Sequence, residues 1–281
     1  MKPLRFKSIR TRLLFWFLLL SLTPLAIGII ITFYQQKKEI EKQTFEKLIA
    51  IRDLKVQQLE DWTSERISDI LTVSSDNELM VLEDILQKEN KDQNDIKNIN
   101  NINRILKRYL NNYSSYIELF IINPKTGIVF SSTNKNNEGI NESGDICFTK
   151  PLEIRKTYIS DIYYSDDLSM ITMTISSPIF SSQHNNSQII GILGAHVNLE
   201  SSLYRLLLHR TGLGETGETL IVNSDGLALN ELRWYQNAPL KLEISAEPAT
   251  LASNGETGIT VSKDYRGEEI LADISNFNGA F

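Results

Sequence analysis

A run of twenty-one uncharged residues near the N-terminus limits what this chain can fold into. It extends from Leu13 to Phe33. At about 1.5 Å per residue, a helix of this length spans a hydrocarbon core of roughly 30 Å. The alternative is a cleaved secretory signal, but a signal core has roughly 7 to 15 apolar residues, and this run continues past the small pair Ala26 and Gly28. The run therefore predicts an uncleaved transmembrane helix, in which Pro24 is tolerated.

Basic residues lie on both sides of this run. Five lie within residues 1–12, which contain no acid, and four lysines follow the run among glutamates. Because the two sides differ by a single basic residue, the positive-inside rule decides little. Twelve residues cannot form a folded unit, so the long body is the part that would be translocated. We expect a cytoplasmic basic tip over 1–12, a location in the cell membrane and an extracytoplasmic body.

The body beyond residue 12 is acidic. It contains 24 Lys and Arg against 35 Asp and Glu, a net charge of −11. Nucleic-acid binders need a basic surface for the phosphates, so this excess disfavours nucleic acid as a partner. The single cysteine, Cys147, cannot form an internal disulfide. We expect it to be a buried free thiol, and the body to depend on its hydrophobic core.

The segment after the apolar run has the pattern of a long helix. From Phe45 to Ile70, apolar residues recur every three to five positions without an intervening Gly or Pro. This predicts a stalk helix over 34–75, and its heptad-like spacing permits a homodimer through this helix. Two shorter helices are predicted over Asn77–Gln87 and Ile96–Tyr109.

Farther along, the apolar period changes from 3.6 to 2, which indicates strands. The predicted strands are Tyr116–Ile122, Ile128–Ser132, Thr157–Tyr164, Met170–Ser176 and Gln188–Leu199. A helix is predicted after them, over Glu200–His209.

Aliphatic and polar residues alternate along the predicted strand 170–176. The aliphatic face consists of Ile171, Met173 and Ile175, and the polar face consists of Thr172, Thr174 and Ser176. The aliphatic face belongs to a core. The polar face either lines a pocket or contacts solvent.

A hairpin pattern occurs twice, about 100 residues apart. Aliphatic residues precede Asn123, and Gly127 with another aliphatic residue follows; the same arrangement surrounds Asn223 and Gly226. The repeat predicts two related α+β modules in tandem, each with an antiparallel sheet.

The first module is expected over 76–210 and the second over 211–281. Two further strands, Ile259–Ser262 and Ile270–Ile274, surround a turn in the second module. No closing strand follows them, so we expect the second module to be either unusually small or truncated.

The sequence contains no constellation that predicts catalysis. Gly212–Gly217 matches G-x-G-x-x-G, but a helix precedes it and a strand follows, which reverses the order that dinucleotide binding needs. We interpret these glycines as a helix stop and a domain junction. The histidines, including His196, show no metal-ligand spacing, and His196 fits a core or pocket position. We therefore expect no enzyme activity in this chain, no cofactor and no metal site.

Several segments together resemble one family. SIRTRLLFWFLLLSLTPLAIG, residues 8–28, resembles the first membrane span of prokaryotic sensor histidine kinases and chemoreceptors, and Leu48–Ile70 resembles the stalk helix of their double Cache (tandem PAS-like) sensor region. Residues 157–180 are similar to the strand pair that closes the pocket of the membrane-distal module. GLGETGETLIVNSDGLALNE with DYRGEEILAD, over 212–273, resembles the membrane-proximal module.

The resemblance implies two Cache modules along one helix, with a small molecule bound in the membrane-distal module. It implies that this chain is the input part of a receptor, whose kinase or other output would lie beyond Phe281. From the loop and strands that line the family's pocket, it also implies ligand-binding residues. These are Asp145, Phe148, Asp161, Tyr163, Thr172 and Thr174.

The family's amino-acid-sensing branch carries an Arg and a Trp-Tyr pair before a strand that ends in Tyr and Asp. Here Tyr163 matches, but the Arg and Trp are absent, and Ser165 stands where the Asp would be. The resemblance therefore does not extend to amino-acid binding.

Three hypotheses follow for the function. The first is the ligand-sensing input region of a sensor histidine kinase or, alternatively, of a chemoreceptor. The second is an anchored assembly module that binds no metabolite and dimerises through the stalk helix. The third, an exported enzyme, lacks a nucleophile, base or metal constellation in the sequence.

Overall fold

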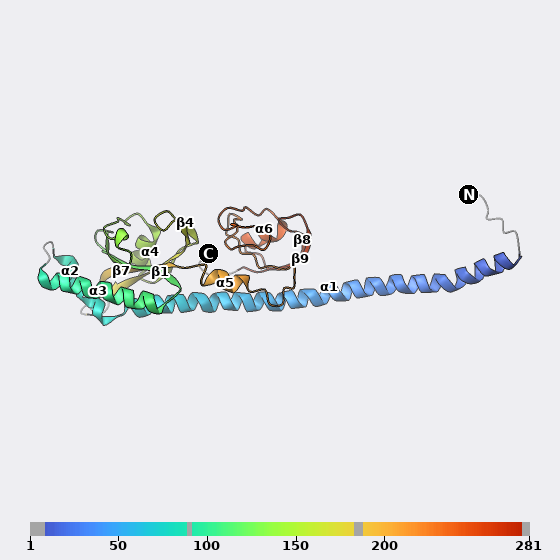
Figure 1. Ribbon diagram of the computed structural model, residues 1–281, viewed down its shortest axis with the longest axis horizontal. Helices are drawn as coiled ribbons and strands as arrows, with labels where there is room; N and C mark the ends of the chain where they lie inside the picture. Colours follow the sequence, from blue (N-terminus) through green and yellow to red (C-terminus); the bar gives the residue numbers. More distant parts are fainter. Residues whose placement is uncertain (1–8, 89–91, 183–187, 277–281) are drawn as a thin grey trace. The chain divides into compact units, whose positions relative to one another are not determined.

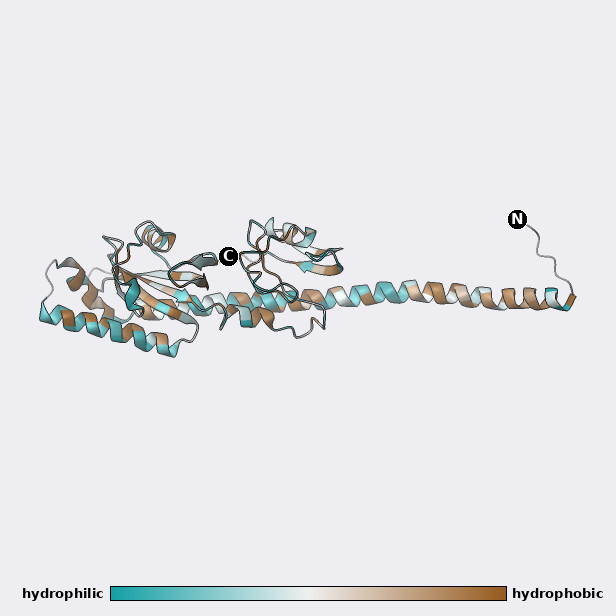
Figure 2. Ribbon diagram, turned by 45° about the horizontal axis from the view of Figure 1, so that its top comes forward, coloured by the Kyte–Doolittle hydropathy of each residue, from teal (hydrophilic) through white to brown (hydrophobic). Residues whose placement is uncertain are grey.

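The computed structural model describes residues 9–88, 92–182 and 188–276. It divides into two compact units, residues 1–50 and residues 51–281. The first described element is the helix α1, Ile9–Ser74, so the predicted membrane span and the predicted stalk belong to one helix (Figure 1). Its N-terminal part is long and apolar enough to cross a membrane, and the brown ribbon in Figure 2 marks these hydrophobic residues. Their side chains are exposed.

The remaining helices are short except for one. They are η1 (Asn77–Val81), α2 (Leu82–Gln87), α3 (Gln93–Asn112), η2 (Lys135–Asn137), α4 (Ile146–Ile154), α5 (Leu203–Leu208) and α6 (Glu247–Ser253). The predicted helix 77–87 is therefore a 3-10 turn followed by a short α-helix. The start of α3 is fixed by a capping box, in which the side chains of Asp92 and Asp95 each accept the other residue's backbone N–H.

The strands form one five-stranded sheet and two separate two-stranded sheets. They are β1 (Tyr116–Ile122), β2 (Val129–Ser132), β3 (Tyr158–Ile159), β4 (Tyr163–Ser165), β5 (Met170–Thr172), β6 (Thr174–Phe180), β7 (Ile189–Val197), β8 (Gly258–Lys263) and β9 (Glu269–Ile274). The large sheet has the order β2-β1-β7-β6-β3, and every neighbouring pair is antiparallel.

The large sheet has two chemically different faces, because successive side chains alternate across a strand. The face turned toward α1, α2 and α3 is mainly apolar, and we call it the α1/α3 face. It is formed by Leu119, Ile121, Ile175, Leu193, Ala195 and Val197, all at 0% exposure. These side chains share one cluster with Ile70 of α1 and with Ile102 and Ile105 of α3, so this cluster is the main core.

The opposite face lies under α4 and the β4–β5 hairpin, and we call it the α4 face (Figure 1). It carries Glu118, Phe120, Ile122, Thr174, Ser176, Ile192, Gly194 and His196. Its apolar members pack with Phe148 and Leu152 of α4 in a second, smaller cluster. The sheet thus separates an apolar core from a layer of mixed polarity.

Two of the predicted strands are each interrupted in the structure. The predicted strand 157–164 is divided into β3 and β4, which belong to different sheets. The predicted strand 170–176 is divided at Met173, because β5 pairs with β4 whereas β6 pairs with β3 and β7. The polar residues of this segment are 0–1% exposed, so the alternative of a solvated face is also wrong.

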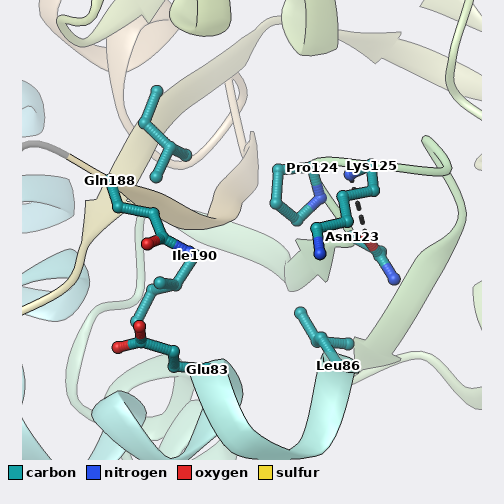
Figure 3. A pocket seen from close by; sticks show the side chains of 8 residues that line it. Glu83, Leu86, Asn123, Pro124, Lys125, Gln188 and Ile190 are labelled. Carbon is teal, nitrogen blue, oxygen red and sulfur yellow. Dashed lines mark hydrogen bonds between the residues drawn. The ribbon is translucent and has the colours of Figure 1, made fainter. Parts of the chain in front are cut away.

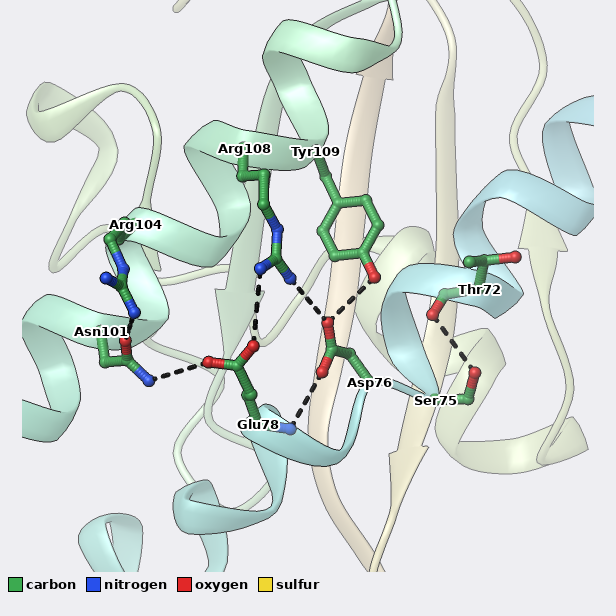
Figure 4. Close-up of polar contacts among 8 residues, drawn as sticks. All are labelled: Thr72, Ser75, Asp76, Glu78, Asn101, Arg104, Arg108 and Tyr109. Carbon is green, nitrogen blue, oxygen red and sulfur yellow. Dashed lines mark hydrogen bonds and ion pairs between the residues drawn. The ribbon is translucent and has the colours of Figure 1, made fainter.

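A polar network joins the end of α1 to α3 (Figure 4). Asp76 caps η1 by accepting the backbone N–H of Glu78 at 2.9 Å. Its carboxylate also accepts hydrogen bonds from Tyr109 at 2.9 Å and from Arg108 at 3.2 Å. Glu78 in turn contacts Arg108 and accepts a hydrogen bond from Asn101. One carboxylate therefore fixes the corner at which the chain turns back along the sheet.

Residues 211–276 have a core of their own, built from small and aliphatic side chains. Its buried members are Ala228, Leu232, Ala238, Ile244 and Ala249. The predicted strand pair is present as β8 and β9, but the predicted hairpin around Asn223 forms only isolated bridges, Val222 with Ala228 and Leu227 with Glu243.

The two segments of the predicted repeat nevertheless have similar hydrogen bonds at their Asn and Gly. Asn123 donates its N–H to Ile128 and its carbonyl accepts that of Gly127; Asn223 does the same with Leu227 and Gly226. Both glycines have positive φ, +70° and +77° respectively. The two turns therefore use the same kinds of residue, Asn and Gly, but the first is one residue longer, and only the first continues into paired strands.

We expect Leu119→Ala to lower the free energy of unfolding by about 2–5 kcal/mol, because it leaves a cavity at the centre of the α1/α3 face. Ile154→Ala removes a 42% exposed side chain of α4 and is the control, with a much smaller loss. Urea unfolding of the full chain in detergent micelles, followed by tryptophan fluorescence, measures both. Equal losses for the two variants would contradict this assignment of the core.

Candidate functional site

Three polar side chains meet on the α4 face. Thr174 Oγ1 lies 2.7 Å from the Tyr163 hydroxyl and 3.0 Å from His196 Nδ1. Thr174 is only 1% exposed, and the other two are partly buried. We call Tyr163, Thr174 and His196 the polar triad; it connects β4, β6 and β7.

The strand register explains why these residues meet. Thr174 stands directly opposite His196 in the β6–β7 ladder, and paired residues place their side chains on the same face. Tyr163 stands opposite Thr172 in the β4–β5 hairpin, which folds over this face. Ser160, in the segment between β3 and β4, accepts the backbone N–H of Thr174 at 2.8 Å. The break between β3 and β4 therefore brings Tyr163 over the sheet.

The members of the triad are neutral at physiological pH. Burial lowers the pKa of His196 to about 4, although Asp145 raises it slightly. Burial also raises the pKa of the Tyr163 phenol well above its usual value. The ring of His196 lies 4.9 Å from the ring of Phe120, centroid to centroid. Neutral hydrogen-bonding groups beside an aromatic ring form a surface suited to recognition by hydrogen bonds and ring contact.

Cys147 lies beside this surface, at the first turn of α4. It is 7% exposed and forms no disulfide, as predicted. Burial raises the pKa of its thiol, and the neighbouring Asp145 raises it further. A thiol held in the neutral form is a poor nucleophile, so this cysteine is not suited to covalent catalysis.

A buried carboxylate lies next to the triad on β1. Glu118 is 1% exposed and stands opposite His196 in the β1–β7 ladder. Its carboxylate accepts hydrogen bonds from Ser132 at 2.5 Å and from Asn137 at 2.7 Å. Burial raises the pKa of Glu118, and these two hydrogen bonds oppose that effect.

One hydroxyl on the same face has no partner. Ser176 is fully buried, and its Oγ makes no hydrogen bond. It follows Thr174 by two positions in β6 and stands opposite Gly194, so it points to the same side as the triad. A buried hydroxyl without a partner is costly, and it leaves a donor and an acceptor for a bound molecule.

The six residues implied by the resemblance have different surroundings. Tyr163 and Thr174 belong to the triad. Phe148 packs in the cluster between α4 and the sheet. Asp145 caps α4, accepting the N–H of Cys147 at 2.5 Å. The hydroxyl of Thr172 donates to the carbonyl of Val197 at 2.9 Å.

The sixth implied residue, Asp161, is exposed. Its backbone carbonyl accepts a hydrogen bond from the Ser160 hydroxyl. The sequence pattern allows His196 a core or a pocket position, and no motif in the sequence marks Glu118. The alternation of β1 and β7 places both on the α4 face, but the pairing of those strands is needed to see it.

A separate depression lies at the other end of β7, between α2 and the β1–β2 turn (Figure 3). Its lining includes Glu83, Leu86, Asn123, Lys125 and Ile190. The Glu83 carboxylate already accepts a hydrogen bond from Ser181 at 2.6 Å. The depression is shallow, and none of its lining residues belongs to the triad. Among the described residues, no group of His, Cys, Asp and Glu is arranged to hold a metal ion.

We expect His196 to make stability pH-dependent. Because its folded pKa of about 4 lies below the ordinary 6.5, the unfolded state binds more protons between these values. Stability should therefore fall as the pH is lowered from about 6.5 to about 4. His196→Gln should flatten this part of the profile, whereas His209→Gln, at an exposed position, should not. Parallel profiles for all three proteins, from denaturation at several pH values, would contradict a buried neutral His196.

No protein-family model matches this chain, and neither does any curated protein. Solved structures do match. The ligand-binding domain of the Campylobacter jejuni chemoreceptor Tlp3, in complex with 4-methylisoleucine, has a TM-score of 0.61 at 17% identity, over 82% of this chain and 85% of that one.

Two further structures extend the comparison. The ligand-binding domain of the Pseudomonas aeruginosa chemoreceptor PctC, in complex with GABA, has a TM-score of 0.57 at 15% identity and covers 83% and 92% of the two chains. The extracellular domain of mmHK1S-Z2, described as a histidine kinase, has a TM-score of 0.57 at 18% identity, with 84% and 93% covered. The double Cache resemblance is thus confirmed at the level of the fold: the chain has the α+β fold of sensory ligand-binding domains from chemoreceptors and histidine kinases, which are not catalytic domains.

Proposed function

We propose that this chain is the membrane-anchored ligand-sensing region of a signal-transduction receptor, the input part of a sensor histidine kinase or a chemoreceptor. Residues 13–33 would anchor it, with residues 1–12 in the cytoplasm and the body outside. A small molecule would bind in the module 76–210, on the α4 face. The observation that carries the proposal is the polar triad, buried in a fold shared with sensory domains.

The contrast between the two sheet faces supports a binding role for the α4 face. The α1/α3 face is mainly apolar and accounts for the main core, and its two buried serines, Ser131 and Ser177, both take part in side-chain hydrogen bonds. The α4 face instead buries hydroxyls, a neutral imidazole and a carboxylate, although burying polar groups gives no net stability compared with apolar packing. One of these groups, Ser176, is unpartnered. Stability alone does not explain this composition, whereas recognition of a polar molecule does.

The cover of this face is suited to admit a molecule. The β4–β5 hairpin has three residues in each strand and shares no ladder with the large sheet. Its tip, residues 166–169, can therefore move without breaking hydrogen bonds of the large sheet, whereas its base is held by the Thr172 hydroxyl on the carbonyl of Val197. Rotation of the Tyr163 side chain at this base would open its contact with Thr174, and a ligand would take its place.

The sheet is hydrogen-bonded to α1 at the start of β1. The Tyr116 hydroxyl lies 3.1 Å from Asp69 and 3.2 Å from the carbonyl of Arg66, and Arg66 donates to Ser115 at 2.6 Å. A displacement of β1 would therefore reach α1 directly. A ligand shifts the balance between two conformations of the sensing region only if it binds one of them more tightly than the other.

The structural neighbours suggest which compounds to test. The Tlp3 domain binds 4-methylisoleucine, isoleucine, valine and norvaline, and the PctC domain binds GABA. All are small molecules that carry an amino group. The Arg and Trp of the amino-acid-sensing branch are absent from this chain, so the screen must extend to amines, organic acids and sugars.

A thermal-shift screen of the full chain in detergent micelles tests the proposal. A compound that binds the native state raises stability by about 2.7 kcal/mol at 100 times its dissociation constant, a readily measured shift. We expect at least one hit, and we expect Thr174→Val to weaken it at least tenfold. Thr149→Val, at an exposed position of α4, is the matched control and should bind normally. A cooperative melt without any hit, or equal binding by both variants, would refute the proposal.

A second candidate function is assembly through α1. Ile40, Leu54 and Leu71 are 63%, 55% and 48% exposed on this helix, which favours a helix-to-helix contact. We propose a homodimer along α1, with or without a ligand. Replacing Leu54 by cysteine should give rapid disulfide crosslinking in membranes, whereas cysteine at Glu153 of α4 should not crosslink. Equal crosslinking at the two exposed positions would contradict this dimer.

A further inference from the structure

A buried charge interrupts the apolar stripe with which α1 packs against the large sheet. The stripe consists of Leu59, Trp62, Ile70 and Val73, which are 0–7% exposed and belong to the main core. Arg66 lies in the middle of this stripe and is 5% exposed. Because a buried charge is costly unless it is paired, the partners of Arg66 are informative.

The partners of Arg66 come from α1 itself and from the start of β1. Within α1, its Nη2 lies 2.8 Å from Glu65, and its Nε lies 3.0 Å from Asp69 without the alignment of a hydrogen bond. Toward the sheet, its Nη1 donates to the Ser115 hydroxyl at 2.6 Å, and its Cζ lies 5.8 Å from the centroid of the Tyr116 ring. The Tyr116 hydroxyl in turn contacts Asp69 at 3.1 Å. We call Arg66, Asp69, Ser115 and Tyr116 the α1 lock.

The α1 lock is attached to the same end of β7 as the polar triad. Tyr116 stands opposite Val197, the residue that follows His196. The carbonyl of Ser115 accepts the backbone N–H of Asn198 at 2.8 Å, directly after β7 ends. The lock and the triad therefore lie on opposite faces of the sheet, and a movement of this end of β7 displaces both.

Stability does not account for the lock. Burial raises the pKa of Asp69, whereas Arg66 and Tyr116 lower it, as expected for a carboxylate withdrawn from water and compensated by its neighbours. Replacing a buried ion pair by apolar side chains of similar volume is often neutral or stabilising. An apolar residue at position 66 would complete the stripe, so the polar contacts serve another purpose.

Hydrogen bonds and apolar contacts respond differently to a movement of α1. Apolar attraction is non-directional, so the stripe tolerates an axial shift of about 1–2 Å, the size typical of helix movements in switching proteins. A shift of this size breaks the 2.6 Å hydrogen bond between Arg66 and Ser115. The lock therefore selects one axial position of α1, which the stripe alone does not.

We propose that the α1 lock fixes the axial position of α1 against the sheet and must open before α1 can shift. The inference rests on the proposed sensing function, in which α1 carries the signal. It names the contact that a ligand-induced movement of β7 releases. Arg66 is the positioning residue of this device: with the lock closed α1 occupies one position, and with the lock removed the stripe holds α1 in several.

Distances between two nitroxide labels test this inference, measured by double electron-electron resonance on the full chain in detergent micelles. Cys147→Ala removes the buried thiol, which leaves a chain without cysteine. Labels are then attached after Asp61→Cys in α1 and Lys125→Cys in the β1–β2 turn, both at exposed positions. Labels at Lys107→Cys in α3 and Lys125→Cys report on the sheet and α3 without α1, and this second distance should stay constant in every variant.

Two double substitutions open the lock. Arg66→Met/Asp69→Leu replaces the ion pair by apolar side chains, and Ser115→Ala/Tyr116→Phe removes only the two hydroxyls. We expect the wild type to give one narrow distance between α1 and the turn. Both variants should unfold cooperatively in urea, and their distance distributions should be broader than that of the wild type or displaced by about 1–2 Å.

Lys55→Met is the matched control, because it removes a second buried cation of α1, whose ammonium donates to Leu206 in α5 and not to the sheet. Its distances should equal those of the wild type. Wild-type distributions in both lock variants would overturn the inference. If the Arg66 variant fails to unfold cooperatively, the hydroxyl variant decides alone. Since no ligand is used, this result would leave the sensing function to be judged by the compound screen.

Discussion

The antiparallel ladder between β6 and β7 is the constraint on which the rest of this structure depends. Its register places Ile175 opposite Ala195 on one face and Thr174 opposite His196 on the other. A shift by one residue would exchange the two faces, so that hydroxyls would enter the main core and aliphatic side chains would lie under α4. Both the stability of the sheet and the composition of the candidate site therefore follow from a single pairing.

The two faces contribute differently to the protein. The α1/α3 face joins helices distant in sequence into one apolar core, and it is rigid because it is closely packed. The α4 face is covered by a nine-residue helix and by a hairpin with no ladder to the large sheet. One face is therefore rigid, and the other is covered by a hairpin that is not paired with the large sheet. This combination suits a receptor whose binding site must open while its connection to α1 persists.

Two further parts of the chain contact the same helix. Arg52 of α1 lies 3.0 Å from Asp273 of β9, whose side chain is 2% exposed. Lys55, one turn farther along α1, donates to the carbonyl of Leu206 in α5 at 2.5 Å. Burial lowers the pKa of Lys55 and raises that of Asp273, as expected for charges withdrawn from water. The helix is therefore tied both to the large sheet and to the C-terminal part of the chain.

The sequence alone determined the elements with strong periodicity or composition: the apolar run 13–33, the long helix after it, β1 and β7, and the turns at Asn123 and Asn223. These depend on neighbouring residues, so local patterns are enough to identify them. The tertiary structure decided where the segments 157–164 and 170–176 break, because each break depends on which strand is the partner. It also placed Glu118 beside His196 of the triad, since residues far apart in sequence meet only through strand pairing.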